Sequence, residues 1–150
     1  MQLPLGMHEI TLTVTDGNGP QGTATDTVVV TVADTVPPEL SVQVTPATLW
    51  PPDHRLVDIA ATVVVSDVCD PSPRVTLASV TSSEPDNAWG DGATFPDIAG
   101  AAAGTDDRSF ALRAERSGIG LGRVYTARYE AADQAANVQA VEVTVRVAHP

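Results

Sequence analysis

Residues 124–147 read VYTARYEAADQAANVQAVEVTVRV, and this stretch decides the fold. Apolar side chains stand at alternate positions on either side of a polar middle, at Tyr125, Ala127, Tyr129 and Ala131 and again at Val141, Val143, Val145 and Val147. Alternation with a period of two is typical of a β-strand with one buried face. The middle segment, 133–137, contains Asp and Asn, which favour turns. The stretch therefore predicts a β-hairpin.

Residues 6–32, GMHEITLTVTDGNGPQGTATDTVVVTV, carry the same pattern about 117 residues earlier in the chain. Asp16 begins the turn there as Asp133 does in the later copy. Such an internal repeat indicates that one supersecondary unit occurs twice. We therefore expect two domains. Residues 1–35 are predicted to be the closing hairpin of a truncated repeat, and residues 36–150 a complete module.

Between the two hairpins, four further segments have the composition of strands and are bounded by Pro, Gly, Asp or Ser: residues 40–44, 56–66, 74–82 and 109–115. The pair Pro37-Pro38 cannot continue a sheet ladder and marks the linker between the domains. About seven short strands in a domain of this length are typical of a sandwich. The fold class is therefore expected to be all-β, an immunoglobulin-like antiparallel β-sandwich preceded by a hairpin.

Composition limits the partners and the location of the chain. The net charge is −11, and all eight basic residues are arginines, so the surface repels phosphate backbones and nucleic-acid binding is not expected. No apolar run is long enough for a membrane span. No signal peptide is recognisable, so for an exported protein we expect the signal upstream of this sequence. Cys69 is the single cysteine and is expected to be a small buried residue, with an intermolecular bridge or a reactive thiol as the alternatives.

The first domain contains an ordered set of motifs: a strand ending in Asp, a turn of small residues, a Val/Thr strand and an Asp-Thr-x-Pro-Pro segment. These are Thr11–Asp16, the loop to Gly22, Thr27–Val32 and Asp34-Thr35-Val36-Pro37-Pro38. In these motifs residues 5–40 resemble the end of a hyalin-repeat (HYR) domain. Many such repeats carry a cysteine in the last strand, where this chain has Thr25–Thr27. The resemblance implies an immunoglobulin-like sandwich from an extracellular adhesion protein.

The second domain contains five short segments that also stand out: Leu49–Arg55, Ser66–Pro71, Glu84–Asn87, Gly90–Gly92 and Leu112–Gly118. In these segments residues 38–148 are similar to a module common in large exported bacterial proteins. The resemblance implies an extracellular β domain, secreted or on the cell surface, whose partners include neighbouring repeats of the same protein.

A long acidic loop, at about residues 82–108, is the candidate metal site. Its candidate ligands are Glu84, Asp86, Asn87, Asp91, Asp97 and Asp107. Ca²⁺ takes six to eight oxygen ligands of these kinds, although the spacing is not that of an EF-hand. Two interpretations stay open, a calcium site and a solvated acidic loop. The arginines at the end of the loop and beyond it, Arg108, Arg113, Arg116 and Arg123, could also pair with these carboxylates.

Asp16 and Asp133 stand where a strand meets its turn, and both are expected to bind backbone N–H groups in Asx turns. The alternative is that they are ligands of an interdomain cation site together with Asp34 or Glu39.

Trp50, His54 and Trp89 are the candidate binding residues. An exposed indole could stack on a sugar or on a protein partner. In the other interpretation, Trp50 plugs one end of the sandwich beside a Pro-Pro bend at which the first strand changes sheets, and Trp89 anchors the acidic loop. Exposure of the two indoles separates these interpretations.

Catalysis has little support, because the sequence lacks a nucleophile elbow, a phosphate-binding loop and a zinc-ligand pattern. We therefore expect a non-catalytic structural or adhesive spacer module, with calcium stabilising the acidic loop. The alternative is a carbohydrate- or protein-binding module that uses Trp50, Trp89 and the long loop. Exposed edge strands also make self-association plausible.

Overall fold

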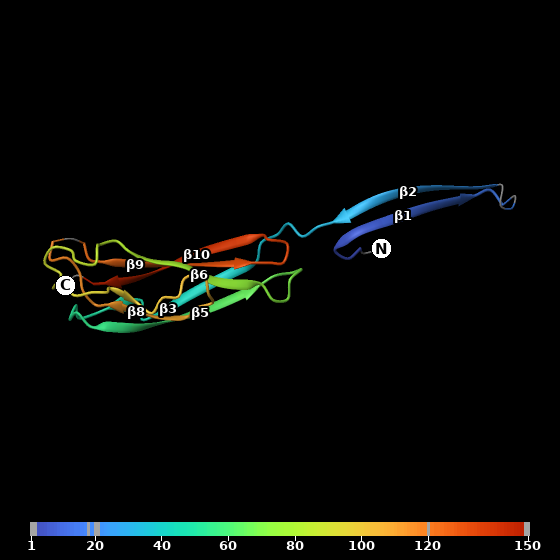
Figure 1. Ribbon diagram of the computed structural model, residues 1–150. Helices are drawn as coiled ribbons and strands as arrows, with labels where there is room; N and C mark the ends of the chain where they lie inside the picture. The colour runs from blue at the N-terminus through green and yellow to red at the C-terminus, as the bar shows by residue number, and fades with distance from the viewer. Residues whose placement is uncertain (1–2, 18, 20–21, 120, 149–150) are drawn as a thin grey trace. The chain divides into compact units, whose positions relative to one another are not determined.

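The computed structural model describes residues 3–17, 19, 22–119 and 121–148 (Figure 1). The chain divides into two compact units, Met1–Val36 and Pro37–Pro150. Ten strands account for the regular structure of the described residues, and no helix among these residues could cross a membrane. The expectation of an all-β chain is therefore confirmed.

The first unit is a two-stranded antiparallel hairpin. Strand β1 (Gly6–Thr15) pairs with β2 (Thr23–Val32) over their whole length. The N–H of Asp16 donates to the carbonyl of Gly22 at 2.9 Å and closes the turn. Residues 18, 20 and 21 of the expected turn lie outside the described residues.

The second unit contains the remaining strands: β3 (Glu39–Thr45), β4 (Thr48–Leu49), β5 (Leu56–Ser66), β6 (Arg74–Ser82), β7 (Ile98–Ala99), β8 (Ser109–Arg113), β9 (Val124–Ala132) and β10 (Val138–Val147). They form two four-stranded sheets, β4-β10-β9-β6 and β3-β5-β8-β7. The sheets lie as two layers, consistent with a sandwich (Figure 1). All pairings are antiparallel except that of β4 with β10.

The core of this unit lies between the two sheets, because each sheet supplies fully buried side chains. Ile59 and Leu112 come from one sheet, and Leu77 and Tyr129 from the other; all four have 0% exposure. The hydroxyl of Tyr129 donates to the carbonyl of Asp107 at 2.8 Å, which satisfies its polar end. The apolar residues at alternate positions of the strands thus point inward from both sheets and form the apolar layer between them.

The two hairpins of the chain have the same register. Subtracting 117 from β9 numbers and 115 from β10 numbers turns every β9–β10 pair into a β1–β2 pair, so that Tyr129↔Val141 becomes Leu12↔Asp26. The bond that closes the turn is also repeated, from the N–H of Asp133 to the carbonyl of Asn137 at 3.2 Å. The internal repeat seen in the sequence is therefore a repeat of strand pairing.

Burial distinguishes the two hairpins. Tyr129 and Ala131 are fully buried, whereas their equivalents Leu12 and Val14 are 64% and 58% exposed. Opposite this face, β1 and β2 carry mostly threonine. The hairpin therefore has an apolar face and a polar face, as in a sheet with one side against a core.

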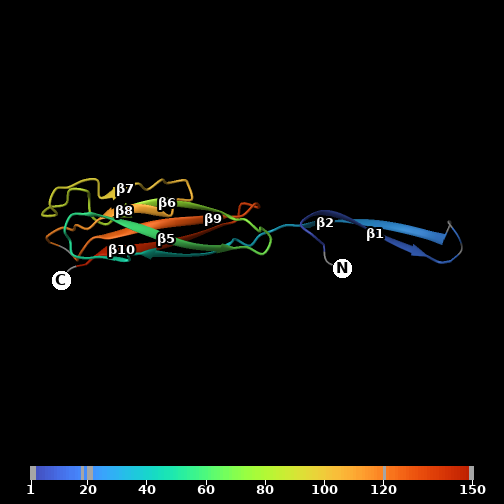
Figure 2. The same ribbon diagram turned by 90° about the horizontal axis from the view of Figure 1, so that it is seen from below.

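Three local expectations were wrong or incomplete. The loop at 82–108 is interrupted by β7, which pairs with β8 at the edge of its sheet (Figure 2). The chain does change sheets early, but between Thr45 and Thr48, ahead of the Pro51-Pro52 bend where we expected the change. Cys69 is exposed, because it lies in a turn closed by Asp67, whose Oδ1 accepts the N–H of Cys69 at 2.8 Å.

Candidate functional site

The candidate site is the end of the sandwich at which three loops meet. Strands β5 and β9 begin at this end, and their antiparallel partners β6, β8 and β10 end there. The loops at 50–55, 83–97 and 114–123 are therefore neighbours, at the left of Figure 1. Loops carried at one end of a rigid sandwich are a frequent place for binding residues.

A buried arginine holds the acidic loop to the sandwich. Arg123 has 0% exposure, and its guanidinium contacts Asp97. It also lies 3.2 Å from Asp91 Oδ2 and 3.3 Å from Glu84 Oε2. Three of the candidate calcium ligands therefore face a fixed positive charge from the protein itself. A guanidinium suits this role because its planar fork presents several donors at once.

A second polar group ties the loop at 50–55 to the same network. Glu115 is fully buried, and its Oε2 lies 3.1 Å from His54 Nδ1 and accepts a hydrogen bond from the hydroxyl of Thr94. His54 has a φ of 66°, a left-handed conformation that is uncommon for a residue with a side chain. Gly92 is required beside it, because a Cβ there would lie 2.5 Å from His54 Cε1.

The arginine interpretation of the acidic loop is confirmed for three of the four arginines. Arg123 pairs as described, Arg113 Nε lies 3.6 Å from Asp97, and Arg108 Nε lies 2.8 Å from Asp106.

The other candidate ligands of the loop have varied surroundings. Asp86 and Asn87 are exposed. Asp107 accepts the N–H groups of Ala102 at 2.8 Å and Ser109 at 3.0 Å. Asp86, Asn87 and Asp107 are not among the ion-pair partners given for Arg123, and calcium in this loop stays a prediction.

Both tryptophans are exposed, Trp50 to 57% and Trp89 to 81%. The expectations that Trp50 plugs the sandwich and that Trp89 anchors the acidic loop were therefore wrong. The loop is held instead by backbone and polar contacts, such as the hydroxyl of Ser117, which donates to the carbonyl of Trp89 at 3.0 Å. Further large apolar side chains are exposed on the same loops: Phe95 at 74%, Ile119 at 71% and Leu121 at 102%.

A shallow groove of about 220 Å³ lies beside Trp50. It is lined by Pro46, Thr48, Leu49, Trp50, Pro51, Asp53, Arg55, Val57 and Ala114. Arg55 Nε donates to Asp53 Oδ2 at 2.7 Å. This hydrogen bond lowers the pKa of Asp53 and raises that of Arg55, so that both groups are charged and the pair is neutral.

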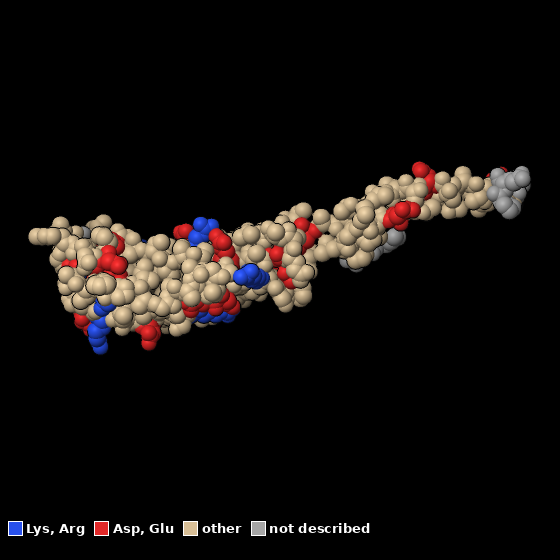
Figure 3. Space-filling view, viewed as in Figure 1, with Lys and Arg blue, Asp and Glu red and all other residues tan. Residues whose placement is uncertain are grey.

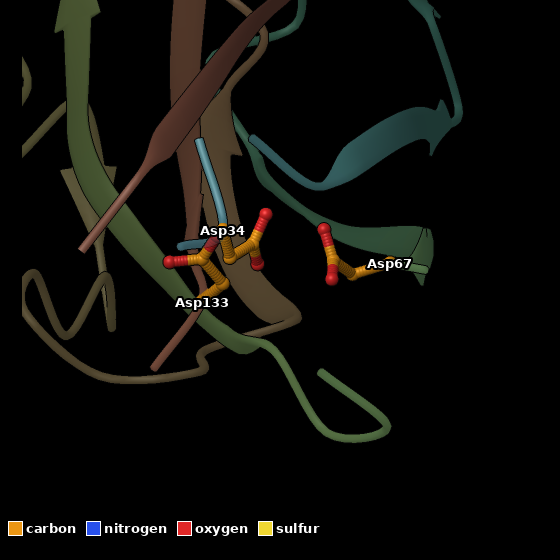
Figure 4. Close-up of side chains that lie close together, drawn as sticks. All are labelled: Asp34, Asp67 and Asp133. Atoms are coloured by element: carbon orange, nitrogen blue, oxygen red, sulfur yellow. The ribbon is translucent and has the colours of Figure 1, made fainter. Parts of the chain in front are cut away.

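Two carboxylates of the second unit could contribute to a metal site. Asp67 and Asp133 each offer one oxygen, and these oxygens lie within 4.8 Å of each other (Figure 4). Like charges at about 4 Å repel by roughly 1 kcal/mol in water and by about 4 kcal/mol at the lower dielectric near a protein surface. A divalent cation would remove this repulsion. In the described part of the chain, no group of three or more such ligand residues comes from the long acidic loop.

Asp133 and Asp34 also bind backbone N–H groups in turns. Asp133 Oδ1 accepts the N–H of Asn137 at 2.8 Å, and Asp34 Oδ1 accepts that of Val36 at 3.1 Å. The expected bond from the Asp133 carboxylate to a backbone N–H is confirmed, but the donor lies four residues on, whereas an Asx turn uses the residue two positions on. Sequence reasoning missed Asp67. The signal for it was its position, because Asp67 and Asp133 directly follow β5 and β9, which run in the same direction.

Comparison with protein-family models finds no match, and comparisons with curated proteins and with solved structures find none either. The function of the chain is therefore inferred from its own residues and geometry.

Proposed function

We propose that this chain is a non-catalytic structural and adhesive spacer of a larger bacterial surface or secreted protein. It would comprise the closing hairpin of one immunoglobulin-like module and the whole of the next. The observation that carries the proposal is the shared register of the two hairpins. The same hairpin face is buried in the core of β9 and β10 but exposed in β1 and β2. A series of similar modules gives this difference when one module is represented only by its hairpin.

The strand order supports the immunoglobulin-like assignment. Taking β3, β5, β8 and β7 as A, B, E and D reproduces one sheet of that fold, and β6, β9 and β10 then correspond to C, F and G. Tyr125 near the start of β9 donates its hydroxyl to the carbonyl of Arg113 at 2.9 Å, a contact similar to the tyrosine corner of such domains. Burial raises the pKa of Tyr125, which keeps the hydroxyl protonated as a donor.

The spacer proposal is tested by measuring how the length of the molecule grows with the number of modules. A chain of three copies of residues 36–150 is expected to give a maximum dimension, by small-angle X-ray scattering, that grows by a similar increment with each added copy. Each module buries its own core and needs no neighbour to fold, so the copies should remain separate. A three-copy chain no longer than one copy would contradict a spacer role.

We further propose that Asp67 and Asp133 bind Ca²⁺. Calcium suits these oxygens because it accepts carboxylates in flexible geometry and completes its shell with carbonyls and water. An acidic chain with a net charge of −11 also concentrates divalent cations near its surface (Figure 3).

Calcium is expected to raise the melting temperature reversibly, with EGTA restoring the original value. At a calcium concentration 100-fold above Kd the stabilisation would be about 2.7 kcal/mol. Asp67→Asn keeps an oxygen for the turn but removes a charge, and should abolish most of the shift. Asp58→Asn, on the exposed side of β5, is the matched control and should retain it. No shift at millimolar calcium in the unmodified chain would exclude the site.

A second candidate function is binding of carbohydrate or protein at the loop end of the sandwich. Exposure of Trp50 and Trp89 favours it, because an indole kept in water at a loop tip contributes little to the core and much to an interface. The two proposals are compatible, since an adhesive spacer needs a contact surface.

A further inference from the structure

The groove beside Trp50 combines an apolar platform with a neutral polar rim. Trp50 and Pro51 are exposed and line it, over an inner surface that includes Leu49 and Ala114, both buried. Asp53 and Arg55 form the polar side. Aromatic faces attract the C–H groups of a ring, whereas a carboxylate and a guanidinium hydrogen-bond to groups around it. A ligand for this groove therefore has an apolar face and a polar edge.

Charge further restricts the class of ligand that the groove can bind. The Asp53–Arg55 pair is neutral as a unit, with Arg55 Nη2 2.6 Å from Asp53 Oδ2. The chain as a whole carries a net charge of −11, which disfavours anionic ligands. The groove volume of about 220 Å³ is suited to one small ring rather than to an extended surface. Hydroxyl groups can both donate to Asp53 and accept from Arg55, as the two charged groups require.

The loop that carries these side chains is held rigidly from behind. The N–H of His54 donates to the carbonyl of Ala114 at 3.0 Å, and the N–H of Ala114 donates back to Arg55 at 2.8 Å. Arg113 Nη1 donates to the carbonyl of His54 at 2.8 Å. The His54 ring contacts the buried Glu115 carboxylate, with Nδ1 3.1 Å from Oε2, and the His54 backbone has a φ of 66°. Backbone strain maintained by surrounding contacts is frequent where a loop is pre-organised for a ligand.

We propose that the groove formed by Trp50, Asp53 and Arg55 is a binding subsite for one neutral pyranose ring of a carbohydrate. Trp50 stacks on the ring, and the Asp53–Arg55 pair hydrogen-bonds to adjacent hydroxyls. His54 is a positioning residue, which fixes the loop through Glu115. The inference rests on the second candidate function above and is independent of the spacer proposal.

The test is a titration of the intact, ¹⁵N-labelled chain with methyl β-D-glucopyranoside, methyl α-D-mannopyranoside and N-acetylglucosamine, followed by NMR. At least one sugar is expected to shift amides of residues 46–57 and of Ala114, with the millimolar Kd typical of a single small ligand. Glucuronic acid should bind more weakly than its neutral counterpart, because of the acidic chain. A proline-rich peptide is titrated in parallel as the competing ligand class.

Single substitutions test which residues form the subsite. Trp50→Ala should weaken binding about tenfold or more, since it removes the aromatic anchor. Trp50→Phe should retain part of it. Arg55→Lys should weaken it through loss of the planar fork. Val68→Ala is the control, an exposed apolar side chain outside the groove lining, and should bind as the unmodified chain does. Circular dichroism verifies that each variant is folded.

Several outcomes would overturn the subsite. One is the absence of shifts with every sugar at 100 mM, a concentration well above the millimolar range in which single small ligands bind. Another is a peptide that shifts the groove amides while the sugars do not. Sugar-induced shifts around Trp89 that disappear in Trp89→Ala would overturn the groove while leaving the binding function in place.

Discussion

Replacing Arg123 by alanine is expected to destabilise the sandwich by about 3–5 kcal/mol, the range typical of removing one partner of a buried ion pair. Arg123 has no exposed surface, and neither has Asp97, while Asp91 is 1% exposed. Without the guanidinium, these carboxylates lose their nearest positive charge but stay out of water. The chain must then protonate them, hydrate them by opening the loop at 83–97, or unfold.

Urea unfolding followed by circular dichroism measures this loss, with Arg128→Ala as the control. Arg128 pairs with Glu130 at 2.9 Å, and the two side chains are 47% and 35% exposed. An exposed pair contributes about 0–1 kcal/mol. The effect of Arg123→Ala should also diminish when Asp91 is changed to asparagine in the same chain, because one buried charge is then gone. If both arginine variants lost the same small stability, the role assigned to Arg123 would be wrong.

The strands were predictable because they depend on local alternation. In the strands of 124–147 and of 6–32 apolar residues recur at alternate positions, and that period specifies both the element and its buried face. The turn-forming residues between the alternating segments then predicted that the two strands of each range pair as a hairpin. The short strands β4 and β7 were not predictable, because two residues cannot display a period.

The polar network was less accessible to sequence reasoning, because its members come from distant segments. Glu115 and His54 are separated by 61 residues, and Arg123 and Glu84 by 39. Arg123 could be named as a possible partner of the acidic loop, but its complete burial follows only from the meeting of three loops at one end of the sandwich.

The exposure of the tryptophans was misjudged for a related reason. Large aromatic residues are usually buried, so Trp50 was expected to fill the end of the sandwich. Arg123, Tyr125 and Glu115 occupy the interior there, and all three are buried to 99% or more. An ion-paired interior leaves no space that an indole must fill. This is the physical reason that the aromatic side chains of this end are available for binding.

The register shared by the hairpins leads to the last expectation, a large difference between two equivalent substitutions. Tyr129→Ala should cost about 3–5 kcal/mol, as for other large-to-small changes of a buried aromatic residue. The lost side chain has 0% exposure, and its hydroxyl bond to the carbonyl of Asp107 is lost with it. Leu12→Ala, at the equivalent position of β1, should change the stability of Pro37–Pro150 by less than about 0.5 kcal/mol.

Urea unfolding of the two variants measures the difference, and Leu12→Ala is the matched control because its residue is 64% exposed on the same strand face. Amide hydrogen exchange adds a local reading, since β9 should exchange far more slowly than β1 in the unmodified chain. Equal protection of the two hairpins would mean that the apolar face of β1 and β2 is already covered, for example by another copy of the chain. If the apolar face of β1 and β2 is uncovered, the amides of β1 must exchange faster than those of β9, because a two-stranded hairpin alone is marginally stable in water.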